Sequence, residues 1–261
     1  MQIQFTKMEW KMKDLKTGIQ MYTIREALKQ DFKGVCRDLV KLGCDGAEFV
    51  QIFGGMEPAE LAAFLKEIGL KACGMHLSAG DFASTDNDPS TFEYVKALGI
   101  KYITFSHGGD FTKVTPDVVR LCGNAGIVAA RNGLQFTYHN HAAEFADFEG
   151  RHALDYIYEN TDPQKVMAEL DVYWVTKGGE DPVKYISRYA KRLPQLHLKD
   201  MDREDGSFTE LGRGCIDLPA CVSAAENSIC EWVIYEQDTC KRPPFESAVM
   251  SLEYLNKLLK R

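Results

Sequence analysis

The sequence is poor in features that mark several common classes of protein. No apolar run approaches the roughly 18 residues that a membrane-spanning helix requires. The stretch from Met1 to Trp10 contains no apolar core of a secretory signal peptide. We therefore expect a protein without a membrane partner that resides in the cytoplasm, with a periplasmic location open if a signal peptide has been removed.

Positive charge and paired cysteines are scarce as well. The chain of 261 residues has 31 Lys and Arg against 38 Asp and Glu, a net charge of −7. Because affinity for nucleic acid comes mostly from a basic surface, we expect no nucleic-acid partner. The eight cysteines include no C-x-x-C pair, and a chain of this length can bury a core without disulfide bonds. We expect reduced, mostly buried thiols and no structural zinc site.

What the sequence does contain is a regular alternation of strands and helices. Such units imply parallel strands joined by right-handed crossovers, and eight of them fit the roughly 250 residues of one α/β barrel. We predict a single (β/α)8 TIM barrel over residues 17–261, after an N-terminal extension over residues 1–16. An open doubly wound sheet is the alternative, but residues 20–25 are not its glycine-rich fingerprint. The expected strands are 18–22, 46–50, 70–75, 101–105, 134–138, 166–170, 194–198 and 232–235.

Polar residues gather where these strands end, which is where the active site of such a barrel lies. The fifth strand is the clearest case, since His139, Asn140, His141 and Glu144 follow it closely. Five of the six histidines lie at strand ends, and His152 is the exception. The full set of candidates is Tyr22 with Arg25, Glu48, His76, His107, His139, His141, Glu144, Asp171, His197 and Glu236.

Four residues are predicted to bind substrate: three of these positions and, in addition, Lys199. Glu48 lies within its strand, where a buried carboxylate needs a partner. His76 and His107 either reach the ligand or are ordinary residues of the barrel rim. Lys199 follows His197 by two residues, so both side chains point to the same side of the strand. Lys199 would hold a substrate oxygen; alternatively it pairs with Asp200 at the rim.

A stronger subset comes from the fifth to eighth strands, which are neighbours in a barrel. It consists of Glu144 or His139, followed by Asp171, His197 and Glu236. Carboxylates that converge in this way repel one another unless a cation lies among them. The mixture of carboxylates and imidazoles suits one divalent metal ion, with Mn²⁺ as the first expectation and Mg²⁺, Co²⁺ or Zn²⁺ as alternatives.

Several motifs resemble the sugar phosphate isomerase/epimerase family with the xylose isomerase-like barrel. That family includes inosose dehydratases, tagatose-type epimerases and hydroxypyruvate isomerases. The resemblance implies a divalent metal held by Glu, Asp, His and Glu on the last four strands, and the last three correspond to Asp171, His197 and Glu236. At the first position this chain has His139. We predict Glu144 as the ligand, with His139 as the alternative. The motifs are residues 20–25, 138–145, 197–200, 210–214 and 235–238.

The predicted function is that of a metal-dependent sugar isomerase or epimerase. The metal would polarise the carbonyl of a sugar or keto-sugar and stabilise an enediolate, while a side chain removes the neighbouring proton. The catalytic candidates are His139, His141, Glu236 and Lys199. The same site would serve a keto-sugar or inosose dehydratase, or a 3-keto-glycoside lyase or hydratase. A non-catalytic sugar-binding barrel is a lesser alternative, and a homo-oligomer stays open.

Overall fold

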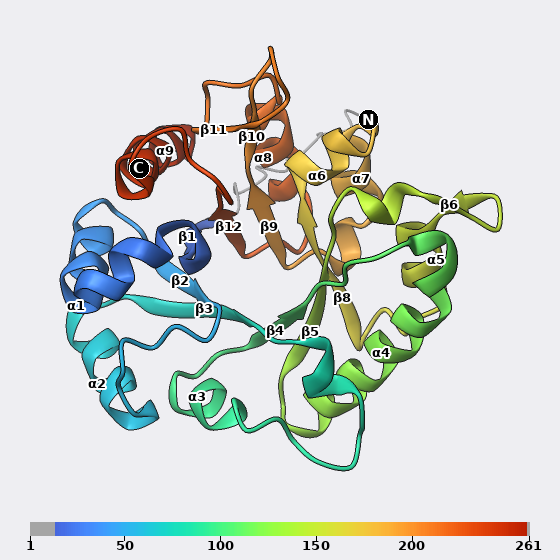
Figure 1. The fold of residues 1–261 in the computed structure, drawn as a ribbon, viewed down its shortest axis with the longest axis horizontal. Coiled ribbons are helices and arrows are strands. Elements are labelled where there is room, and N and C mark those ends of the chain that lie inside the picture. The colour runs from blue at the N-terminus through green and yellow to red at the C-terminus, as the bar shows by residue number, and fades with distance from the viewer. Residues whose placement is uncertain (1–13, 260–261) are drawn as a thin grey trace, which may run out of the picture.

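The computed structural model describes residues 14–259, and its centre is a closed barrel of eight parallel strands (Figure 1). The predicted TIM barrel is therefore confirmed. Strand β1 begins at Lys16, and residues 1–13 of the expected extension lie outside the described residues. In order around the barrel, the strands are β1 (Lys16–Gln20), β12 (Trp232–Tyr235), β9 (Gln195–Leu198), β8 (Val166–Asp171), β5 (Gln135–His139), β4 (Tyr102–Phe105), β3 (Lys71–His76) and β2 (Gly46–Phe49).

Helices cover the outside of the barrel, as Figure 1 shows. Their apolar faces pack on the outward side chains of the strands and form the main core. Helix α2 illustrates the local rules, because it begins at Pro58 and is followed by Gly69 with a φ of +79°. The helices are α1 (Arg25–Lys41), α2 (Pro58–Ile68), α3 (Phe92–Ala97), α4 (Phe111–Arg131), α5 (Ala153–Glu159), α6 (Val172–Lys177), α7 (Pro182–Arg188), α8 (Leu218–Glu226) and α9 (Pro244–Leu258).

The interior of the barrel has an apolar part and a polar part. A small apolar cluster, separate from the main core, joins the buried side chains of Cys73, Tyr102, Trp232 and Ile234. Trp232 fits there because Gly46 has no side chain, since a Cβ at that position would lie 2.8 Å from the indole ring. Toward the carboxyl ends of the strands the inward residues become polar and charged. The polar and charged side chains of the interior therefore lie at the carboxyl end of the barrel.

Two local features differ from the sequence-based expectations. The first strand ends at Gln20, and residues 21–24 form a short 3-10 helix, because the Gln20 side chain accepts a hydrogen bond from the backbone N–H of Tyr22. Residues 201–215, where no strand was expected, contain a hairpin strand, β11 (Phe208–Thr209), that pairs with β10 (Asp200–Met201). The Asp200 carboxylate accepts backbone N–H groups of Gly212 and Gly214, so it orders this loop and does not pair with Lys199.

The remaining connections add a second hairpin. Strands β6 (Asp147–Phe148) and β7 (Arg151–His152) follow the fifth barrel strand and precede α5, so His152 is the residue just before that helix.

The described part of the chain contains all eight cysteines and no disulfide bond. Six of the thiols are buried, while Cys240 is half-buried and Cys215 is exposed. Within residues 14–259, none of the helices has both the length and the apolar character needed to cross a membrane.

Candidate metal centre and active site

Neighbouring strands bring four of the candidate ligands together. Strands β5, β8, β9 and β12 lie side by side, and the register pairs Asp171 with His197. Each of the four side chains offers one ligand atom, and these atoms all lie within 4.8 Å of one another. All four residues are buried. We call this set the outer group, and it consists of His139, Asp171, His197 and Glu236.

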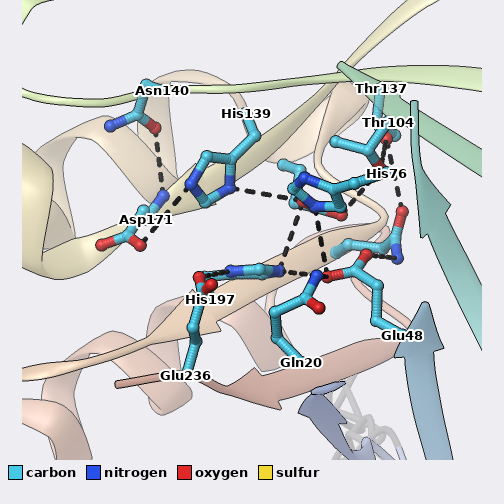
Figure 2. A network of polar contacts seen from close by, with 12 residues as sticks. Gln20, Glu48, His76, Thr104, Thr137, His139, Asn140, Asp171, His197 and Glu236 are labelled. Carbon is cyan, nitrogen blue, oxygen red and sulfur yellow. Dashed lines mark hydrogen bonds and ion pairs between the residues drawn. The ribbon is translucent and has the colours of Figure 1, made fainter. Parts of the chain in front are cut away.

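A second set of ligand-type atoms overlaps the first. The inner group consists of His76, His139, Glu169 and His197, so it shares two histidines with the outer group. Glu169 was missed in the sequence analysis, although it precedes Asp171 by two residues and must therefore point to the same side of β8. Figure 2 labels all four residues of the outer group and the three histidines of the inner group, which lie in one polar network.

Charge accumulates around the outer group. The ammonium Nζ of Lys199 lies 3.1 Å from Oδ2 of Asp171, 2.8 Å from Oε2 of Glu236 and 3.0 Å from Oδ1 of Asp238. Although burial opposes the charge, Lys199 and His197 hold the pKa of Glu236 well below its usual range. Although burial opposes the charge, Glu169 and Glu48 raise the pKa of His197 well above its usual value, so this imidazole is protonated. Three carboxylates against one ammonium and one imidazolium leave an excess of one negative charge when all are ionised. A divalent cation that displaces the proton of His197 would balance the resulting excess of two.

The outer group also has the donor chemistry that a divalent cation requires. Oδ2 of Asp171 is buried and has no contact of hydrogen-bond geometry within residues 14–259, although the Lys199 ammonium lies 3.1 Å away as an ion pair. Burial, reinforced by His197, lowers the pKa of His139 well below its usual range, so its imidazole is neutral and has a free lone pair. Two imidazoles and two carboxylates match the ligand preferences of Zn²⁺ and Mn²⁺. These residues therefore fit the expected metal ion.

The structure does not bring Glu144 to the other three expected ligands. Its Oε1 accepts a hydrogen bond from the Tyr138 hydroxyl at 2.9 Å, and its Oε2 accepts the backbone N–H of His141 at 3.0 Å. Tyr138 and His139 are consecutive on β5, so they point to opposite sides of the strand, and Glu144 joins the outward side with Tyr138. His139, the alternative ligand, occupies the place beside the other three.

A cavity of about 380 Å³ opens at this end of the barrel. Burial, together with Lys199, lowers the pKa of His141 to about 4, so this imidazole is neutral near pH 7. Burial and the neighbouring Glu236 raise the pKa of Asp238 to about 6. Asp238 was not among the expected site residues, although it ends the motif over residues 235–238. The cavity is lined by Gln20, Tyr22, Val50, His76, Ser106, His139, His141, Lys199, Glu236 and Asp238.

Two of the expected substrate-binding residues are not among the residues that line this cavity. The ring of His107 packs edge-on against Phe105 and Phe111, with ring centroids 6.0 Å apart in both cases. Glu48 lies fully buried in the network of Figure 2, where Nε2 of His197 is 2.7 Å from its Oε2. His76 and Lys199, by contrast, reach the cavity.

Comparison with known proteins places the chain in a family. A model described as a xylose isomerase-like TIM barrel matches residues 36–258. The chain belongs to this family. The motifs in the sequence had indicated the same group, and that prediction is confirmed.

Individual relatives share modest identity over most of their length. The inosose dehydratase of Geobacillus kaustophilus is 27 % identical over 270 residues, covering 86 % of each chain. A sugar phosphate isomerase/epimerase from Parabacteroides distasonis has a TM-score of 0.77 at 22 % identity, over 93 % of this chain and 98 % of that one. A structure of the IOLI protein with a zinc atom has a TM-score of 0.72 at 15 % identity, over 94 % and 98 %. At these identities, the two structural matches show the fold alone.

Proposed function

We propose that the chain is a divalent-metal-dependent enzyme that removes a proton next to the carbonyl group of a sugar or keto-sugar. The observation that carries this proposal is the outer group beside the cavity, with its excess of negative charge and its neutral imidazole at His139. We assign the metal to His139, Asp171, His197 and Glu236. A divalent cation there would supply Lewis acidity toward two oxygens of the substrate.

His141 is the candidate general base. Its side chain lines the cavity, next to the ring of His139 at a centroid distance of 5.3 Å. A neutral imidazole accepts a proton, and general-base help of this kind contributes roughly 10²- to 10⁴-fold to the rate. The Trp174 ring packs edge-on against the His141 ring, with ring centroids 5.4 Å apart, and supports the orientation of the imidazole.

Lys199 and Asp238 are the candidates for handling the substrate oxygens. Although burial opposes its charge, Lys199 has its pKa raised by Asp171, Glu236 and Asp238, so the ammonium stays protonated and can donate to a carbonyl or developing oxyanion. Asp238, with a pKa near 6, is a candidate acid for a departing hydroxyl group. In a dehydration, His141 would take the proton from carbon, the C–O bond would break, and the hydroxide would leave as water with the proton of Asp238.

The names of the relatives favour dehydration over isomerisation. The relative with 27 % identity is an inosose dehydratase, and it covers 86 % of this chain. A keto-inositol or a related keto-sugar is therefore the first substrate class to test. A 3-keto-glycoside lyase or hydratase would use the same base and the same metal site.

The test is proton exchange followed by NMR in D₂O. Metal-depleted protein is loaded with Mn²⁺ and incubated with inososes, keto-sugars and 3-keto-glycosides. Before the spectra are recorded, the Mn²⁺ is chelated and the protein is removed from the sample. We expect deuterium, or loss of water, at the carbon next to the carbonyl group. His141→Gln should slow this step by about 10²-fold or more. His152→Gln is the matched control, because His152 lies on the β6–β7 hairpin outside the cavity. Absence of exchange with every substrate, despite bound Mn²⁺, would overturn the proposal.

A further inference from the structure

We infer that Glu48 and Glu169 are positioning residues, which hold the two histidines of the outer group in the tautomers that bind metal. This inference rests on the proposed metal site and goes further, because it assigns a role to Glu48 and Glu169, which we call the inner carboxylates. Each histidine has two ring nitrogens, and the nitrogen that can bind a metal is decided by the hydrogen bond at the other one. In both histidines, one nitrogen faces an inner carboxylate and the other faces the outer group.

The first pair is His197 with Glu48. Nε2 of His197 lies 2.7 Å from Oε2 of Glu48, and Nδ1 lies 2.9 Å from Oε2 of Glu236 (Figure 2). Carboxylates at 2.7 Å and 2.9 Å hold a proton on each ring nitrogen, since each contact is otherwise between two acceptors. A metal ion beside Glu236 would displace the proton of Nδ1, while Glu48 keeps the proton on Nε2. Nδ1 would then carry the lone pair. That lone pair points to the place where Glu236 and the metal would meet.

The second pair is His139 with Glu169. Nδ1 of His139 lies 3.3 Å from Oε1 of Glu169, whereas Nε2 faces Oδ2 of Asp171 at 3.8 Å. The two atoms do not meet hydrogen-bond geometry, but at this distance the Glu169 carboxylate attracts a proton on Nδ1 electrostatically. That proton leaves the lone pair of Nε2 directed at the outer group. The strand register supports this arrangement, because it places His139 of β5 directly opposite Glu169 of β8.

The surroundings hold both carboxylates in place. The Gln20 amide donates to Oε2 of Glu48 at 2.8 Å, and the Thr104 hydroxyl donates to Oε2 of Glu169 at 3.1 Å. Gly74 leaves room for Glu48, since a Cβ there would lie 2.7 Å from its Oε1. Both carboxylates are fully buried, with 0 % exposure, and neither lines the cavity. They are thus built to act on the histidines and not on the substrate.

The same geometry explains why a metal in the inner group is disfavoured. A cation there would need the lone pairs of Nε2 of His197 and Nδ1 of His139, the two nitrogens that face the inner carboxylates. The ring of His76 adds a further proton to this space, because its Nε2 lies 2.9 Å from Oε1 of Glu169. Glu48, through its hydrogen bond to His197, and Glu169, through its ion-pair contact with His139, therefore support the outer group in the manner of carboxylate–histidine–metal triads.

The experiment measures metal affinity and tautomers in the full chain. Mn²⁺ binding is followed by electron paramagnetic resonance in wild type, Glu48→Gln and Glu169→Gln. We expect each variant to bind Mn²⁺ about 10- to 100-fold more weakly. Glu210→Gln is the control, because Glu210 is also buried but bonds to Ser247 and Arg242, away from the metal site. In addition, ¹⁵N spectra of the Zn²⁺-loaded wild type should show a protonated Nε2 in His197 and a protonated Nδ1 in His139.

The outcomes separate the two proposals. If wild type binds no Mn²⁺ or Zn²⁺, the proposed function fails, and this inference fails with it. If wild type binds metal but both Gln variants bind equally well, or the spectra show the opposite tautomers, the positioning role alone is overturned. The wild-type spectra also decide the matter if either variant fails to fold.

Discussion

The Tyr138 hydroxyl donates a 2.9 Å hydrogen bond to Glu144, and this contact holds the carboxylate outside the ligand group. A metal ligand would have to abandon that bond and cross to the inward side of β5. We therefore predict that Glu144→Gln leaves Mn²⁺ affinity unchanged within about 2-fold, whereas His139→Ala weakens it by about 10-fold or more. Titration with Mn²⁺ by calorimetry makes the comparison. A large loss of affinity in Glu144→Gln would restore Glu144 as the ligand.

The same carboxyl group predicts a pH dependence of stability. Burial raises the pKa of Glu144 from 4.5 to about 7, so the folded chain holds this proton more tightly than the unfolded chain. Its contribution to the free energy of unfolding is therefore complete below about pH 4.5, falls as pH rises toward 7, and is lost above it, with a total of about 3 kcal/mol.

Glu144→Gln removes this titration while keeping the size of the side chain. The difference in unfolding free energy between variant and wild type, measured by urea denaturation, should shift in favour of the variant between about pH 5 and about pH 8. Other titrating groups largely cancel in that difference. If the difference stays constant over this range, the carboxyl group does not titrate there and the prediction is wrong.

The barrel and much of its site could be predicted because both depend on periodicity. Alternating strands and helices fix the fold, and a residue at the end of a parallel strand lies at the active end whatever the details. Asp171, His197 and Glu236 needed only that rule. Loop residues follow no such rule, so Glu144 was placed by its chemistry alone, and its partner Tyr138 could not be anticipated.

The sequence also could not predict how deep an inward-pointing side chain lies along the barrel axis. Alternation says that Glu48 and Glu169 point inward, but only the register between strands says how far they lie below the cavity. Glu48 was thus predicted to bind substrate, whereas the structure places its Oε2 2.7 Å from Nε2 of His197, and we propose that it positions this histidine. His107 was predicted to reach the substrate because it follows a strand. In the structure its ring packs against Phe105 and Phe111.

The accessibility of the thiols gives a prediction that is independent of the site. Cys215 is exposed and Cys240 is half-buried, while burial raises the pKa of Cys36 and Cys221 to about 12. A thiol reagent such as DTNB reacts with exposed thiolates. In the native protein, we expect Cys215 to react first, Cys240 more slowly, and the six buried thiols only after unfolding. Cys215→Ser should abolish the fast phase; fast reaction of additional thiols would contradict the burial described here.

The Lys199 ammonium lies among carboxylates that we assign to the metal site, so its removal tests the charge balance of that site. Its buried ammonium is shared by Asp171, Glu236 and Asp238, so Lys199→Met leaves three carboxylates without their cation. Removing one partner from a buried ion pair costs about 3–5 kcal/mol, and we expect a destabilisation of that order in metal-free protein.

A divalent cation should restore much of this loss, because it would balance the same carboxylates. The increase in melting temperature on adding Mn²⁺ should therefore be larger in Lys199→Met than in wild type. Lys241→Met is the control: Lys241 also bonds to two carboxylates, but its side chain is 57 % exposed, and water replaces it with little change in stability. If Mn²⁺ stabilises Lys199→Met no more than wild type, the ammonium and the metal do not share these carboxylates, and the assignment of Asp171 and Glu236 as ligands loses its electrostatic basis.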